Sequence, residues 1–296
     1  MSLKTVLRTF RPSFLVLTPV CVFLGLSTVL STQAPISHVM VLLVFIGAIF
    51  AHISVNTLNE YFDFKSGLDL TTNKTPFSGG SGALPNAPEV AGLVLKVGLL
   101  SLMITIIVGV YLIIERGLQI LPIGLIGVML IITYTQWINR SPWLCLIAPG
   151  LGFGVLMVVG TPLVLTGSYS PLAWLVSLVP FFLVNNLLLL NQYPDIHADA
   201  CVGRKTFPIV FGVKKSNLMY AGFMLAAYTL ILLSVLNGYI PTLGLIALVP
   251  MVLSLFALYG AVKHVEKIAE APQYMAANVA ATLLTPFLLG VAIVNG

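Results

Sequence analysis

The stretch HVMVLLVFIGAIFAHISVNTLNEYFD, residues 38–63, decides the fold class of this chain. No Asp, Glu, Lys or Arg precedes Glu60 within it, so it is apolar for long enough to cross the roughly 30 Å hydrocarbon core of a bilayer as a helix. Over all 296 residues, 58% are hydrophobic and 8% are charged, whereas a soluble protein is about 25% charged. This composition excludes a soluble globular enzyme, a disordered chain and a nucleic-acid-binding domain. It predicts an all-α, polytopic membrane protein.

Breaks at polar or Pro/Gly clusters divide the chain into about nine candidate transmembrane helices. They cover residues 12–31, 38–62, 90–114, 118–138, 143–166, 171–193, 217–237, 241–262 and 273–294. We expect a single transmembrane domain over residues 1–296, with the first apolar segment retained as a span. Most connections are short, but two are long, at about 63–89 and 194–216.

The basic residues predict the orientation. With the N-terminus in the cytoplasm, all but one of the 14 Lys and Arg residues fall at the inner side, and only Arg116 lies outside. Such a bias is typical of cytoplasmic loops. We therefore expect a multi-pass protein of the cell (inner) membrane whose N-terminus and two long loops are cytoplasmic. The net charge of +5 then reflects this orientation rather than a nucleic-acid partner.

The aspartates mark an internal repeat. All four lie in the two long loops: Asp63, Asp69, Asp195 and Asp199. The segment NEYFD at 59–63 matches NQYPD at 191–195, four predicted spans later. An even number of spans preserves the orientation of the chain, so we expect a parallel repeat of spans one to four and five to eight, followed by a ninth helix.

A polar stripe rises from the first aspartate into the membrane. His52, Asn56, Asn59 and Asp63 follow the i, i+4, i+7, i+11 spacing of one helix face. Lipid would leave these groups unsatisfied, so the stripe is expected to face a cavity or another helix. For His52 a hydrogen bond between helices is favoured over a catalytic role.

The two motifs carry the hard oxygen ligands that Mg²⁺ prefers, and Mg²⁺ usually completes its shell with water and substrate phosphate. The predicted metal ligands are Asn59, Asp63, Asp69, Asn191, Asp195 and Asp199. Cationic side chains that would neutralise a departing diphosphate lie in the same loops: Lys65, Lys74, Arg204 and Lys205. The pattern predicts a cytoplasmic site for Mg²⁺ and a diphosphate.

These motifs resemble those of the UbiA superfamily of membrane-embedded prenyltransferases. The specific signatures are Asn59-x3-Asp63-x5-Asp69, Asn191-x3-Asp195-x3-Asp199 and the following GRKTF at 203–207; supporting pieces are Arg11-Pro12, TPFSGG at 75–80 and Tyr134-Thr135. The resemblance implies nine helices around a central cavity with cytoplasmic Asp-bearing loops. Within the family, the x5 spacing and the Ser-Gly-Gly run resemble the 1,4-dihydroxy-2-naphthoate branch of quinone biosynthesis. Departures are Glu60, the order Arg204-Lys205, and Phe153 where relatives often carry Glu.

The function that we infer is Mg²⁺-dependent transfer of a polyprenyl group from its diphosphate to an aromatic acceptor, with 1,4-dihydroxy-2-naphthoate as the best acceptor. Asp63 and Asp195 act through the metal, and Tyr134 is expected to stabilise the allylic cation, with Tyr61 and Tyr193 as further candidates. The predicted substrate-binding residues are Asn59, Asn191, Lys74, Arg204, Lys205, Arg11 and Asn56.

Other functions stay open at this point. A membrane terpene cyclase would use the same Mg²⁺ sites without an aromatic acceptor, and prenyl transfer to a non-aromatic acceptor would also fit. A secondary transporter is less favoured, because its polar residues would cluster near the bilayer midplane and its repeats are often inverted. A CDP-alcohol phosphotransferase would need a denser acidic motif than this chain carries.

Overall fold

The computed structural model describes residues 2–72 and 74–296, and within them it is helical without any strand. Eight helices are long and apolar enough to cross a membrane: Pro12–Leu30, His38–Lys65, Pro88–Arg116, Pro142–Thr166, Pro171–Asn191, Phe207–Leu236, Thr242–Glu270 and Pro272–Asn295. The predicted span at 118–138 is a shorter apolar helix, Leu118–Thr133, because the chain leaves the helix at Tyr134 and turns toward Pro142. The predicted all-α, polytopic membrane architecture is confirmed.

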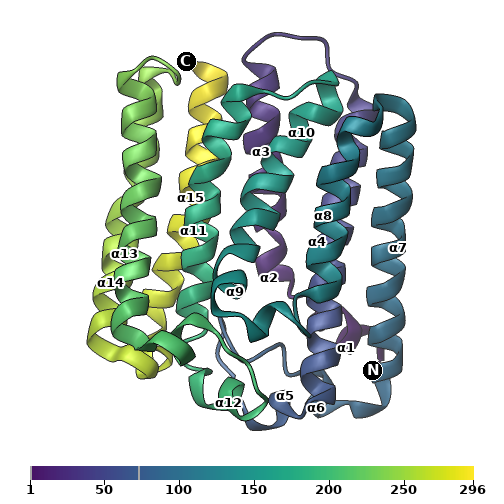
Figure 1. Ribbon diagram of the computed structural model, residues 1–296, viewed down its shortest axis with the longest axis vertical. Helices are drawn as coiled ribbons and strands as arrows, with labels where there is room; N and C mark the ends of the chain where they lie inside the picture. The colour runs from purple at the N-terminus through teal and green to yellow at the C-terminus, as the bar shows by residue number, and fades with distance from the viewer. Residues whose placement is uncertain (1, 73) are drawn as a thin grey trace.

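The long α-helices stand side by side as a bundle (Figure 1). They are α3 (Leu17–Leu30), α4 (His38–Lys65), α7 (Ala91–Arg116), α8 (Leu121–Thr133), α10 (Met157–Thr166), α11 (Pro171–Asn191), α13 (Phe207–Leu236), α14 (Met251–His264) and α15 (Pro272–Asn295). The two chain ends lie at opposite ends of the bundle (Figure 1). Opposite ends require an odd number of crossings, so the shorter α8 counts as a ninth pass.

The remaining helices are short and connect or extend the long ones. They are α1 (Ser2–Thr9), α2 (Pro12–Leu15), α5 (Leu68–Thr71), α6 (Ala83–Asn86), α9 (Pro142–Pro149) and α12 (Ile196–Cys201), with 3₁₀ turns η1 (Pro88–Val90), η2 (Leu118–Ile120), η3 (Ile138–Arg140), η5 (Thr242–Leu248) and η6 (Val265–Glu270). Helices α1, α5, α6 and α12 gather at one end of the bundle (Figure 1). Both Asp-bearing loops therefore lie at the same end, as their even helical separation requires.

Large apolar side chains cover much of the outside of the bundle. Ile107 on α7, Leu125 on α8 and Val252 on α14 are each more than half exposed, at 58%, 57% and 69%. Contiguous apolar surface of this extent is unfavourable in water and is expected where lipid covers it. The chain is thus a multi-pass membrane protein by its surface as well as by its helix lengths.

Buried polar side chains join the helices of the C-terminal half. Asn186 on α11 donates to Tyr220 O at 2.9 Å, and Tyr220 on α13 donates through its hydroxyl to Asn278 Oδ1 on α15 at 2.8 Å. Hydrogen bonds between helices hold membrane bundles together where the hydrophobic effect does not distinguish protein from lipid. The neighbouring Asn185 also joins two segments, since its Oδ1 accepts from Gly150 N at 2.6 Å.

One crossing of the bundle contains a π-helical segment, η4 (Gly150–Leu156), between α9 and α10. It packs closely on α11: a Cβ added at Gly154 would overlap the backbone of Phe181, at 2.6 Å from its Cα. Only glycine permits this approach, and π segments are often found at functional sites. The segment carries Phe153 on the face that lines the central cavity.

We expect Gly154→Ala to lower the stability of the bundle, because the added methyl group must push η4 away from α11. Overpacking of this kind costs about 1–3 kcal/mol. Gly222→Ala on α13 is the matched control, since a Cβ there meets no atom within 4 Å. Thermal unfolding in detergent should show a midpoint below that of the wild type for the first variant and an equal or higher midpoint for the second, because alanine is the better helix former. Equal midpoints would contradict the close packing described here.

Candidate active site

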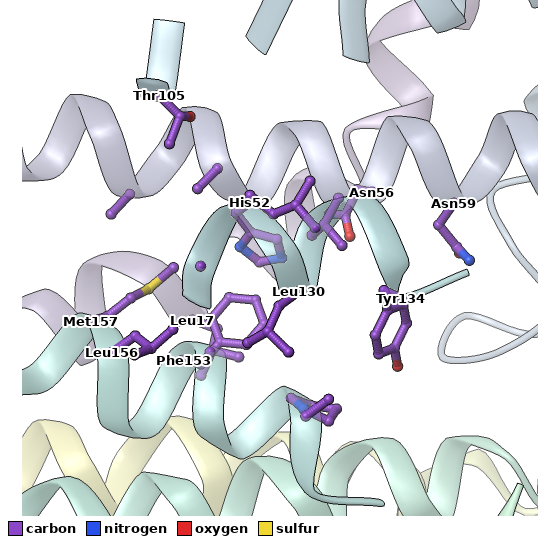
Figure 2. A pocket seen from close by; sticks show the side chains of 18 of the residues that line it. Leu17, His52, Asn56, Asn59, Thr105, Leu130, Tyr134, Phe153, Leu156 and Met157 are labelled. Atoms are coloured by element: carbon purple, nitrogen blue, oxygen red, sulfur yellow. The ribbon is translucent and has the colours of Figure 1, made fainter. Parts of the chain in front are cut away.

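A cavity of about 650 Å³ opens inside the bundle. Helices α4, α7, α8, α10 and α11, the π segment η4 and both Asp-bearing loops contribute to its lining. Figure 2 shows Asn59 and Tyr134 toward one end of the cavity, Leu156 and Met157 toward the other, and His52 between them. The cavity is therefore polar at the end that carries the Asp motifs and largely apolar away from it.

The first Asp motif lies at the end of α4. Asp63 is in its last turn and is 6% exposed, and Asp69 on α5 is 4% exposed. Gly67 turns the chain between them with φ of +80°, a conformation that favours glycine. Both carboxylates line the cavity, as predicted.

The second Asp motif begins where α11 ends. Asn191 is the last residue of α11, and Pro194 separates that helix from α12, which contains Asp199. Asn191, Asp195 and Asp199 all line the same cavity as the first motif. Two segments far apart in sequence therefore converge at the polar end of this cavity, which we call its mouth.

Arg204 joins the two motifs. Its guanidinium forms an ion pair with Asp63 Oδ1 and a second one with Asp199 Oδ1 at 2.9 Å. All three side chains are at least 85% buried, which limits screening by water. The residue predicted to neutralise a diphosphate thus holds the carboxylates of both motifs together.

A glycine-containing loop closes over the aspartates. Gly79 N donates to Asp195 Oδ2 at 3.1 Å, and Ser81 donates to Glu60 through its backbone N at 2.7 Å and its hydroxyl at 2.6 Å. Gly80 has φ of +71°, and a Cβ there would lie 2.9 Å from Asp69 Oδ1. The loop thereby contacts acids of both motifs, and Gly80 allows its backbone to pass close to Asp69.

Glu60 is the residue of this site whose contacts the sequence did not reveal. It is fully buried, and besides Ser81 it accepts a hydrogen bond from Arg11 Nε at 2.8 Å. Arg11, with φ of +50°, also donates to Asn59 Oδ1 at 3.2 Å and lines the cavity. Glu60 stood out in sequence only as a departure from the family motif; its partners come from segments that pattern reasoning cannot pair with it.

The oxygen atoms at the mouth fit a hard divalent cation. Asp69 Oδ2, Asn191 Oδ1 and Asp195 Oδ1 are buried and have no hydrogen-bond partner among the described residues. An unsatisfied buried oxygen costs about 1–3 kcal/mol, which a bound cation would offset. No compact group of three or more Asp, Glu, His or Cys side chains occurs in the described chain. An ion here would therefore also need water or phosphate ligands, as Mg²⁺ commonly does.

The loop aspartates are easily protonated without a cation. Burial, together with the neighbouring Glu60 and Asp63, raises the pKa of Asp69 to about 7. Burial and the nearby Asp199 raise the pKa of Asp195 to about 7 as well. A divalent ion favours the charged form of an adjacent carboxylate. The two residues would be held as anions when metal is bound.

Not every predicted residue reaches the cavity. The side chains of Lys74 and Lys205 are exposed and do not line it, and the Lys205 backbone N donates to Asn139 O at 2.8 Å. Among the tyrosine candidates, Tyr134 lines the cavity, whereas Tyr61 packs edge-on against Phe62 and Tyr193 bonds to Asn217 at 2.8 Å. Asn56, predicted to bind substrate, does line the cavity.

Two named proteins are similar to this chain in amino-acid sequence. The chain is 29% identical over 204 residues to 1,4-dihydroxy-2-naphthoate octaprenyltransferase of Bacillus subtilis, covering 67% of this chain but only 64% of that protein. It is 28% identical over 263 residues to UbiA prenyltransferase domain-containing protein 1 of Dictyostelium discoideum, covering 86% of this chain and 78% of the other.

Solved structures share the fold at low sequence identity. A digeranylgeranylglyceryl phosphate synthase superposes with a TM-score of 0.71 at 16% identity, over 100% of this chain and 99% of that one. A UbiA homologue from Archaeoglobus fulgidus, bound to DMAPP and Mg²⁺, gives 0.70 at 15% identity, over 98% and 99% of the two chains. The sequence pattern of the UbiA prenyltransferase family matches residues 17–292. Two converging Asp motifs on this fold, together with that match, show that the chain belongs to the UbiA prenyltransferase family.

Proposed function

We propose that this protein is a Mg²⁺-dependent prenyltransferase that joins the polyprenyl group of an isoprenyl diphosphate to an aromatic acceptor. The observation that carries the proposal is the convergence of both Asp motifs, through Arg204, at the mouth of an apolar cavity. A diphosphate needs cations and a prenyl chain needs an apolar channel, and the two requirements meet at one place in this molecule.

The relatives support the substrate classes. The Bacillus relative is named for 1,4-dihydroxy-2-naphthoate and an octaprenyl group, and the Archaeoglobus homologue has been solved with DMAPP or GPP and Mg²⁺. We propose 1,4-dihydroxy-2-naphthoate as the acceptor of this chain, a substrate of quinone biosynthesis. A long prenyl donor agrees with the depth of the apolar lining, formed in part by Leu43, Ile113 and Leu156.

The metal ligands in this proposal are the carboxylates and amides of the two motifs: Asn59, Asp63, Asp69, Asn191, Asp195 and Asp199. Bound Mg²⁺ supplies positive charge that compensates the leaving diphosphate. Arg204, already between Asp63 and Asp199, adds a cation at the same place. Negative charge grows on the diphosphate as the allylic C–O bond breaks, so these groups stabilise the transition state more than the ground state.

The allylic cation forms next to Tyr134, whose ring lies at the polar end of the cavity beside Asn59 (Figure 2). Asn59 Nδ2 donates to Thr135 Oγ1 at 3.2 Å, which ties α4 to this segment. A desolvated cation over an aromatic face is stabilised by about 2 kcal/mol. The acceptor carbon then forms the new C–C bond and a base or water takes the ring proton, while diphosphate departs with the electron pair of the broken bond.

We expect Asp63→Asn and Asp195→Asn each to reduce prenyl transfer at least a hundredfold, because each removes a charged oxygen from the predicted metal site. Glu115→Asn is the control, since this exposed acid lies at the other end of α7. Purified protein is incubated with Mg²⁺, radiolabelled geranyl diphosphate and a panel of phenols, and products are separated by chromatography. EDTA should stop turnover and Mg²⁺ should restore it. Turnover that persists in EDTA would overturn the metal dependence, and cyclised hydrocarbon would identify a terpene cyclase.

Glu60 should be required for an ordered site although it is no predicted metal ligand. We expect Glu60→Ala to lower the free energy of unfolding by about 2 kcal/mol, because Arg11 and Ser81 lose their buried acceptor. Glu89→Ala, at an exposed position of the same loop region, is the comparison. Unfolding in detergent gives the stabilities of both. A Glu60 variant as stable as the Glu89 variant would contradict the role assigned to this contact.

The cytoplasmic orientation of the Asp-bearing loops can be tested by labelling a cysteine that the chain already contains. Cys201 on α12 is exposed, whereas Cys21 and Cys145 are buried. In intact cells, a membrane-impermeant maleimide should leave Cys201 unlabelled until the membrane is permeabilised. Ser168→Cys in a Cys201→Ser background places a thiol in the exposed loop before α11, at the opposite end of the bundle, and should react without permeabilisation. The reverse pattern would invert the proposed orientation.

A further inference from the structure

Two polar groups in the middle of the cavity have no role in holding a diphosphate. His52 is 4% exposed and lines the cavity, and Asn56 lines it one helical turn closer to the Asp motif. At 1.5 Å per residue, His52 lies about 16 Å from Asp63 along the axis of α4. His52 is therefore too far along the helix to share an ion with Asp63.

The His52 ring is held by one nitrogen and open at the other. Nδ1 lies 2.8 Å from the hydroxyl of Thr18, which is fully buried on α3. Nε2 makes no hydrogen bond to a described residue, and it is not one of the fully buried polar atoms that lack a partner. Asn56 has the same character: its Nδ2 donates to Phe10 O at 2.9 Å, and its Oδ1 has no partner in the described chain. Each side chain is anchored and presents one free polar atom.

An aromatic side chain lies beside the His52 ring. Phe153 of the π segment packs edge-on against the His52 ring, with centroids 4.6 Å apart, and Figure 2 shows His52 pointing from α4 toward it. The other polar side chains at this depth are satisfied by their own helices: Thr105 donates to Ser101 O at 3.0 Å and Thr161 to Met157 O at 2.7 Å. The hydroxyl protons of both threonines are thus used within their own helices, whereas Nε2 of His52 and Oδ1 of Asn56 have no partner among the described residues.

A prenyl chain offers no partner to such groups. Covering Nε2 of His52 and Oδ1 of Asn56 with hydrocarbon would leave two buried polar atoms unsatisfied, at a cost of about 1–3 kcal/mol each. A ligand that carries both an aromatic ring and an oxygen function would instead pack on Phe153 and bond to these atoms. We propose that His52, positioned by Thr18, recognises a hydroxyl of the aromatic acceptor, with Asn56 as a second contact. This inference rests on the proposed function and deepens it by locating the acceptor.

The test compares the KM for the acceptor with the KM for the prenyl donor. His52→Phe keeps an aromatic ring and removes Nε2, and we expect it to raise the KM for 1,4-dihydroxy-2-naphthoate about tenfold, the factor of one lost hydrogen bond. The KM for geranyl diphosphate and its Mg²⁺-dependent Kd should stay within twofold. His52→Gln, whose amide nitrogen can replace Nε2, should recover most of the acceptor affinity. Thr32→Val, at an exposed position outside the cavity where the hydroxyl donates to Val29 O, is the control and should alter neither KM.

The outcomes distinguish this inference from the proposed function. An unchanged acceptor KM in His52→Phe, or a parallel loss of donor affinity, would overturn the inference while prenyl transfer by the wild type stands. If His52→Phe does not fold, Thr18→Val decides, because it frees the ring and should raise the acceptor KM alone. Equilibrium dialysis of 1,4-dihydroxy-2-naphthoate covers the remaining case. A wild type that binds but does not prenylate it refutes the function, and the Kd of His52→Phe still tests the contact; absence of binding refutes both.

Discussion

The site depends on a buried cation between two sets of carboxylates. Arg204 pairs with Asp63 from the first half of the chain and with Asp199 from the second. Removing these charges from water is expensive, and a buried ion pair rarely stabilises a fold more than apolar residues of the same size would. Its presence in a chain with only 8% charged residues is therefore explained by function: it keeps acids that would repel one another at one mouth.

A second ion pair extends the same principle to the surroundings of the mouth. Arg11, Glu60 and Ser81 connect the start of the first span, the end of α4 and the loop that covers the aspartates. Through Gly79 the loop also reaches Asp195. The polar end of the cavity is consequently one connected set of contacts, whereas beyond His52 and Asn56 the lining is largely apolar and suits a hydrocarbon chain. This separation of charge from hydrocarbon within a single cavity is what a reaction between an ionic head and a lipid tail requires.

In the proposed function, different helices and different parts of one helix contact different substrate groups. Helix α4 carries metal ligands at its end and polar acceptor contacts two to three turns farther in, all on one face. The π segment supplies Phe153 opposite that face, at 4.6 Å from His52. The diphosphate, the acceptor and the prenyl tail contact different parts of one cavity. A substitution in one of these parts is therefore expected to change the binding of one group without changing that of the others. Gly150 and Gly154 let η4 approach α11 closely, because a side chain at either position would overlap Phe181.

The sequence by itself determined the membrane architecture, the position of most helices and the two Asp motifs, because hydrophobic length and the 3.6-residue period act locally along the chain. It also singled out Arg204, Tyr134 and Asn56, all of which line the cavity. Only the tertiary structure separated Arg204 from its neighbour Lys205, which points to the surface, and assigned Glu60 and Thr18 their partners. Those distinctions depend on contacts between segments dozens of residues apart, and the free energy of such contacts is set by packing in three dimensions, which local sequence patterns do not encode.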